Sequence, residues 1–134
     1  MHIDGGCHCG AVRYQAGINP DRVVICHCTD CQIVSGSAFR TVVQAKAEDF
    51  KLLQGSPKIY IKTGESGNRR ALAFCADCGS HVYATNAEPP HDLYGLRVGT
   101  IDQRAQLRPA LQVWCQSKLD WLDNLPSLAS MDKQ

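Results

Sequence analysis

The stretch Cys26-His27-Cys28-Thr29-Asp30-Cys31 places three thiols within six residues, in the spacing C-x-C-x-x-C. Tetrahedral zinc binds sulfur at about 2.3 Å, so its ligand sulfurs lie about 3.8 Å apart, and a short turn can bring three thiols that close. Three protein ligands leave one zinc position free for water or substrate, as in catalytic rather than structural sites. We therefore predict an open, catalytic zinc site at Cys26, Cys28 and Cys31.

Two further cysteine groups flank this stretch, Cys7-His8-Cys9 upstream and Cys75-Ala76-Asp77-Cys78 downstream. In an extended strand, residues two apart point to the same side, so both thiols of a C-x-C pair can reach one ion. A C-x-x-C pair followed by glycine, here Gly79, is typical of a zinc knuckle, in which the flexible glycine lets backbone amides turn toward the sulfurs. These four thiols are enough for a closed, structural zinc site.

The spacing alone allows the seven thiols to be divided between two ions in more than one way. Keeping the central triplet on one ion costs the least loop-closure entropy, which favours it as a unit. The alternative splits the triplet and produces the groups Cys7/Cys9/Cys26/Cys28 and Cys31/Cys75/Cys78.

Three histidines adjoin the cysteine groups and are further candidate ligands. Alternation along an extended chain turns His8 and His27 away from the sulfurs beside them, so we expect both to pack or to face solvent. His81 follows Gly79 by two residues, close enough to orient a group at either metal. Its role is left open by the sequence.

The length of 134 residues fits one domain, which we place at residues 1–125, followed by a loose tail at 126–134. Hydrophobic residues make up 44% and charged residues 20% of the chain, as in ordinary globular proteins. The formal net charge is +1 with no basic cluster, so we expect no nucleic-acid partner. No apolar run is long enough for a membrane span, so we expect no membrane partner either.

The cysteine pattern favours metal ligation over disulfides. The N-terminal residues Met1–Gly6 lack the basic start and apolar core of a signal peptide, which predicts a cytoplasmic, reducing location. Seven of the eight cysteines lie in C-x-C or C-x-x-C groups, the spacing of metal ligands. Cys115 stands alone beside Trp114, and we interpret it as a small, buried apolar residue.

Short alternating segments bounded by Gly, Pro and Asn predict a mostly β fold. A single helical turn is expected from Thr29 to Val34, because threonine can cap it and Gly36 can end it. The expected strands cover residues 11–16, 22–26, 38–43, 50–54, 58–62, 69–74, 81–85, 93–98 and 111–115.

The chain resembles the glutathione-dependent formaldehyde-activating enzyme family, which includes centromere protein V. The resemblance runs in order along most of the sequence, and three ordered cysteine groups make it specific. It is carried by Gly5–Val12, Cys26–Cys31 with Ser35-Gly36-Ser37, Phe74–Ser80, Gly99–Asp102 and Ser117–Trp121.

The resemblance implies a fold of several small antiparallel sheets, arranged as a β-tent around a structural zinc. It implies two Zn2+ per chain, the catalytic one held by Cys26, Cys28 and Cys31. The resemblance likewise implies that the structural zinc is held by the first C-x-C and the last C-x-x-C, here Cys7, Cys9, Cys75 and Cys78.

The resemblance also implies a carbon–sulfur lyase or synthase, which joins formaldehyde to the thiol of glutathione to give S-hydroxymethylglutathione, or reverses that step. Asp30, inside the central turn, is a candidate general base, although turn aspartates commonly bond backbone amides instead. Three alternatives stay open: an enzyme of the same fold for another thiol or aldehyde, a non-catalytic zinc-stabilised binding module, and a redox protein with Cys28 and Cys31 as a reactive pair.

Overall fold

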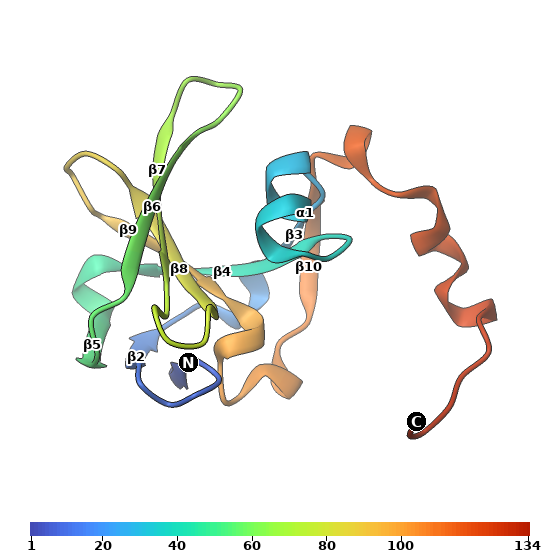
Figure 1. Cartoon of the computed structure of the whole chain (residues 1–134), viewed down its shortest axis with the longest axis horizontal. Helices are drawn as coiled ribbons and strands as arrows, with labels where there is room; N and C mark the ends of the chain where they lie inside the picture. The colour runs from blue at the N-terminus through green and yellow to red at the C-terminus, as the bar shows by residue number, and fades with distance from the viewer.

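The computed structural model describes all 134 residues and contains two β-sheets (Figure 1). One has three strands in the order β1-β2-β5, and the other has seven in the order β10-β3-β4-β9-β8-β7-β6. The strands are β1 (His2–Gly6), β2 (Arg13–Gly17), β3 (Val23–Cys26), β4 (Arg40–Lys46), β5 (Phe50–Gln54), β6 (Lys58–Thr63), β7 (Arg69–Phe74), β8 (His81–Asn86), β9 (Leu93–Arg97) and β10 (Pro109–Val113).

The mostly β prediction is confirmed, and the three-stranded sheet is small and antiparallel as expected. The second sheet is large and mixed, because β10 enters it beside β3 in the same direction. Parallel neighbours need a long crossover, and almost the whole domain lies between these two strands in sequence. The alternation of apolar and polar residues predicts individual strands, but it does not predict which strands pair when they lie far apart in sequence.

The core lies between the two sheets. Tyr14 on β2 and Ile3 on β1 are fully buried, and they cluster with Val43 of β4 and Leu96 of β9. Phe50 of β5 stacks on Tyr94 of β9 with ring centroids 4.4 Å apart, which joins the sheets at one end. The other face of β3, β4 and β9 is thus left for the site described below.

Strand β1 was not among the predicted strands. Glycine and aspartate are poor strand formers, and the segment His2–Gly6 contains both. Gly5 is needed here because a Cβ atom at this position would lie 2.4 Å from the Tyr14 ring. Close packing against β2, rather than local propensity, therefore holds this strand in place.

Helix α1 (Thr29–Ser35) is confirmed, with Gly36 ending it in the left-handed conformation at φ 63°. Cys28, rather than Thr29, is the N-cap, and its sulfur accepts a hydrogen bond from the Cys31 N–H. The sequence therefore places the helix correctly and misses its cap by one residue.

The large sheet curves around α1. Helix α1 follows β3, which is five strand steps from the edge strand β6, or about 24 Å across a flat sheet. Yet Asp30 of α1 pairs with Lys62 of β6 at an Nζ–Oδ2 distance of 2.7 Å. The curvature makes a hollow at the start of α1, and Figure 1 shows the β6–β7 hairpin standing beside the helix.

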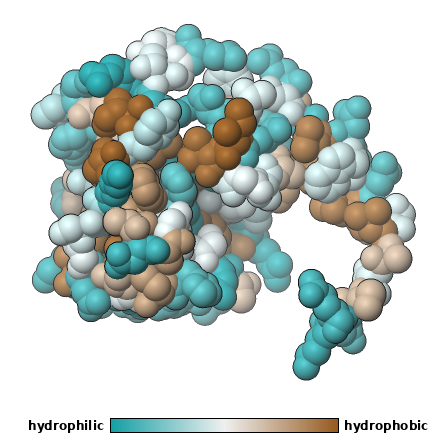
Figure 2. Space-filling view, in the orientation of Figure 1, coloured by the Kyte–Doolittle hydropathy of each residue, from teal (hydrophilic) through white to brown (hydrophobic).

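After Val113 the chain leaves the sheets as an arm of 3-10 turns, Cys115–Ser117 and Asp120–Ser127 (Figure 1). The second of these turns runs through the predicted boundary between residues 125 and 126, which stays a prediction. Apolar side chains lie exposed along the arm (Figure 2), namely Trp121, Leu125, Leu128 and Met131. No helix in the structure is both long and apolar enough to cross a membrane.

Candidate metal centres

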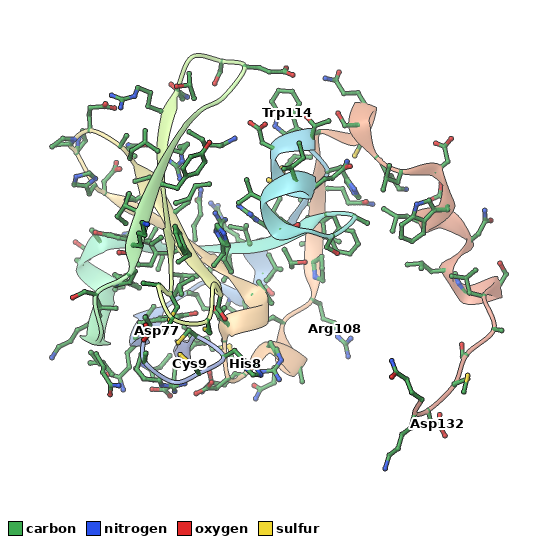
Figure 3. The ribbon with its side chains drawn as sticks, in the orientation of Figure 1. His8, Cys9, Asp77, Arg108, Trp114 and Asp132 are labelled. Carbon is green, nitrogen blue, oxygen red and sulfur yellow. The ribbon has the colours of Figure 1, made fainter.

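Four sulfurs meet where the β1–β2 connection approaches the β7–β8 turn. Cys7 and Cys9 come from the first segment, Cys75 and Cys78 from the second, and all four Sγ atoms lie within 4.8 Å of one another. The Cys7–Cys9 sulfur distance is 3.6 Å and the Cys9–Cys75 distance is 3.7 Å. Both agree with the spacing of about 3.8 Å that tetrahedral zinc requires. Figure 3 shows His8 and Cys9 close to Asp77 of the other turn.

Backbone and hydroxyl donors surround these four sulfurs. The Val12 N–H donates to the Cys7 sulfur at 3.2 Å, and the Ser80 hydroxyl lies 3.2 Å from the Cys78 sulfur. The His8 N–H donates to the same Ser80 hydroxyl at 3.0 Å, which joins the two segments. Hydrogen bonds from Ser80, and a further one from the backbone of Cys9, lower the pKa of the Cys78 thiol to about 5. The donors at Cys7 and Cys78 lower the pKa of these two thiols and so favour their thiolate forms, in which cysteine binds metal.

Gly79 makes this turn possible. It adopts φ +76°, in the left-handed region that glycine tolerates, and its N–H donates to the Cys75 carbonyl at 2.9 Å. The tight turn brings Cys75 and Cys78 to one side, as the C-x-x-C-Gly pattern predicts.

The three sulfurs of the central triplet lie at the junction of β3 and α1. Cys26 ends the strand, Cys28 caps the helix and Cys31 lies in its first turn, with all Sγ atoms within 4.8 Å of one another. All three residues are partly exposed, whereas Cys7 and Cys75 of the four-sulfur group are buried. No histidine, aspartate, glutamate or fourth cysteine joins this group.

These two groupings exclude the alternative division of the seven thiols. The groups consist of Cys7, Cys9, Cys75 and Cys78, and of Cys26, Cys28 and Cys31. All eight cysteines are free, so the chain contains no disulfide. Two cysteine clusters, one of four and one of three, are consistent with two zinc sites.

The neighbouring histidines lie outside both clusters. His8 is exposed, and His27 is buried against Phe39 with its Nε2 atom 2.7 Å from Oε1 of Gln112. Both outcomes agree with the expected alternation. His81 stacks on Phe74 with ring centroids 5.4 Å apart, and burial together with Arg40 and Arg97 lowers its pKa.

The prediction that Cys115 is buried is wrong, because this residue is exposed. Trp114 before it adopts a left-handed conformation at φ 56° and turns the chain out of the sheet. The apolar pattern of β10 extends to residue 115 in sequence, but the strand ends at Val113. Cys115 consequently belongs to neither cluster.

Asp30 contacts a side chain rather than the backbone amides of its turn. Its carboxylate pairs with Lys62, and both line a cavity of about 210 Å3 together with Cys28, Arg70 and Trp114. Figure 3 shows Trp114 beside the start of α1. This cavity gives one route from solvent to the central triplet.

Two arginines beside the triplet were missed by the sequence analysis. Arg40 and Arg97 are 7% and 9% exposed, and both line a second cavity, of about 620 Å3, with Cys26 and Cys31. Burial, and to a smaller extent Arg40, lowers the pKa of Arg97 to about 9. The available signal was an arginine at the first residue of β4 and another at the last residue of β9, which is weak because strand ends often carry charge.

Comparison with known proteins agrees with this architecture. A sequence model of the glutathione-dependent formaldehyde-activating enzyme family matches residues 2–117. A crystal structure of a Rhodobacter sphaeroides protein matches with a TM-score of 0.62 at 19% sequence identity, covering 82% of this chain and 99% of the other. The second match supports the fold alone, whereas the first extends over both cysteine clusters. The chain belongs to the glutathione-dependent formaldehyde-activating enzyme family.

Proposed function

We propose that this protein is a zinc-dependent carbon–sulfur lyase or synthase that acts on a thiol–aldehyde adduct. The reaction joins formaldehyde to glutathione to form S-hydroxymethylglutathione, or reverses that step. Cys26, Cys28 and Cys31 hold the catalytic zinc, and the four-sulfur group holds the structural zinc. The single observation that carries the proposal is a three-sulfur group that has no fourth side-chain ligand and borders two cavities.

Zinc with three thiolate ligands and one free position can bind a thiol and favour its thiolate form, or polarise an aldehyde oxygen. The triplet orients this position, because Cys26 is fixed by β3 while Cys28 and Cys31 are fixed by the first turn of α1. The hydrogen bond from the Cys31 N–H keeps the Cys28 sulfur in place at 3.2 Å. A thiol delivered through either cavity therefore meets a preformed position.

The addition forms one C–S bond while the carbonyl C=O becomes a C–O single bond. The sulfur loses a proton and the alkoxide oxygen gains one, so the atoms balance without a further reactant. Asp30 and Lys62 line the cavity beside Cys28 and form an ion pair at 2.7 Å. They are the groups that we assign to proton transfer, with Asp30 accepting and Lys62 donating.

The proposal is tested by the exchange rate between free formaldehyde and its glutathione adduct, measured by NMR with carbon-labelled formaldehyde. We expect the zinc-loaded protein to accelerate exchange above the spontaneous rate, and Cys28→Ser to return it to that rate. Cys115→Ser is the matched control, because this exposed cysteine belongs to neither cluster. Exchange that is unaffected by the zinc-loaded protein would refute the proposed activity, and a faster rate with another thiol would reassign the substrate.

A further inference from the structure

Two buried arginines have no partner in this protein. Arg40 and Arg97 are 7% and 9% exposed, and the Arg40 Nη2 and Arg97 Nε atoms are buried without a hydrogen-bond acceptor. The ion pairs of the chain all involve other residues. Burying a guanidinium without a hydrogen-bond acceptor costs free energy. Two such groups in one fold therefore indicate a function that offsets this cost.

Strand register places both arginines on the triplet's face of the sheet. Cys26 pairs with Arg40 across β3 and β4, and Val42, two residues further along β4, pairs with Arg97 of β9. Side chains two apart on a strand share a face, so the two arginines and Cys26 point the same way. All three line the cavity of about 620 Å3.

The remaining walls of this cavity offer the arginines little compensation. Val24, Val42 and Leu111 make its sides apolar. Its one carboxylate, Asp21, is exposed and adjoins Arg22, which also lines the cavity. The guanidiniums therefore face a largely apolar space in which a charged ligand would be held strongly.

The zinc-loaded triplet balances only part of this charge. Three thiolates and one Zn2+ sum to about −1, against two guanidinium groups of +1 each. The planar guanidinium fork matches the two oxygens of a carboxylate. Formaldehyde carries no charge and cannot fill this role, so the missing anion belongs to the other reactant.

We propose that Arg40 and Arg97 form a carboxylate-binding subsite, which holds a carboxylate of the thiol substrate while its sulfur lies at the triplet. The identity of the thiol rests on the proposed function, whereas anion binding at the two arginines does not. The substrate class is a thiol that carries a carboxylate, and neutral thiols are selected against.

Binding of reduced glutathione and of its diethyl ester to the zinc-loaded protein, measured by calorimetry, tests this subsite. The ester keeps the thiol and neutralises both carboxylates. We expect the ester to bind the wild type about 10- to 100-fold more weakly than glutathione, the range of a charge-assisted hydrogen bond.

Arg97→Met and Arg40→Met should weaken glutathione binding by a similar factor and leave ester binding unchanged. Arg108→Met, at an exposed arginine labelled in Figure 3, is the matched control and should bind as the wild type does.

Thermal unfolding of the ligand-free variants separates substrate binding from a structural role. Removing an unpaired buried charge should leave the melting temperature of Arg97→Met equal to or above that of the wild type. A lower melting temperature, or equal losses of glutathione and ester binding in this variant, would overturn the subsite. If Arg97→Met fails to fold, Arg97→Lys can replace it, because lysine keeps the positive charge and lacks the planar guanidinium. Glutathione binding to Arg97→Lys with wild-type affinity would also overturn the subsite.

Failure of the subsite can be told apart from failure of the proposed function. S-methylglutathione has both carboxylates and no free thiol, so its binding reports the arginines alone. Loss of its binding in Arg97→Met would support the subsite even if formaldehyde exchange is not catalysed. Catalysed exchange with equal KM for glutathione and its ester would support the function and overturn the subsite.

Discussion

The two cysteine clusters differ in how their ligands are assembled. In the four-sulfur cluster, Cys9 and Cys75 are 66 residues apart in sequence, and the cluster joins the β1–β2 connection to the β7–β8 turn. The three-sulfur cluster is built from one stretch of six residues at the start of α1, and all of its members are partly exposed. A metal that joins distant segments would stabilise the fold, whereas a metal held by ligands close in sequence would stabilise it little.

The largest effect is expected from Cys75→Ser. This change removes one of four candidate ligands from a site that links distant segments, and binding of a structural zinc supplies about 10–16 kcal/mol of apparent folding free energy in zinc-finger peptides. We expect poorly folded protein without a cooperative melting transition, measured by circular dichroism. A Cys75→Ser protein with the wild-type melting temperature would show that this cluster does not stabilise the fold.

The corresponding change in the other cluster, Cys28→Ser, should affect activity more than stability. Only local chain is released, so we expect the melting temperature to fall by less than about 4 °C. The same preparation should no longer accelerate formaldehyde exchange with glutathione. If Cys28→Ser still accelerates formaldehyde exchange, the three-sulfur cluster has no part in the mechanism. If Cys28→Ser unfolds, this cluster stabilises more than the local chain.

Stepwise metal removal distinguishes the clusters without mutation. The partly exposed triplet should release zinc to a chelator first, because it offers one fewer protein ligand than the four-sulfur cluster and borders two cavities. We expect loss of about one zinc per chain with the circular dichroism spectrum unchanged, and release of the second only on unfolding. Metal analysis of samples withdrawn during chelation measures both steps, and simultaneous loss of both ions would contradict the distinction.

The smallest effect concerns Tyr14, which is fully buried in the core cluster that also contains Cys7 and Cys75 of the four-sulfur group. Its hydroxyl lies 2.9 Å from the Thr100 hydroxyl, and burial raises its pKa to about 12. The folded pKa lies above the unfolded value of about 10, so the neutral phenol stabilises the fold below about pH 10 and this contribution is lost toward pH 12. Phenolate absorbance should therefore show a step near pH 12, and Tyr14→Phe, which costs about 1 kcal/mol, should remove that step.

Local sequence rules predicted the parts of the molecule that are local. The C-x-C-x-x-C spacing predicted the triplet, and Gly36 and Gly79 predicted the turns that they form. Most strands were predicted for the same reason, since alternation is a property of neighbouring residues. Strand β1 was missed because its stability comes from packing against Tyr14 rather than from its own residues.

Features that depend on distant pairing could not be predicted from spacing. The division of the seven thiols needed either the family resemblance or the fold, because Cys75 reaches Cys9 only through the assembled sheets. Arg40 and Arg97 face the triplet through the register of β3, β4 and β9, which the sequence does not reveal. Cys115 was misassigned because β10 ends at Val113, two residues before the expected end of the strand at residue 115. The chain leaves the sheet at Trp114, and Cys115 is therefore exposed to solvent.

We propose that the metal at one cluster has four protein ligands, whereas the metal at the other has three and a free position. Optical spectra of the protein with Co2+ in place of zinc test it most directly, because cobalt absorption reports the ligands of each ion. We predict that reduced glutathione changes the spectrum of one cobalt per chain, and that Cys28→Ser abolishes the change while leaving the other cobalt unaffected. A spectrum that shows two ions with complete protein coordination and no response to glutathione would contradict an open position at the three-sulfur cluster.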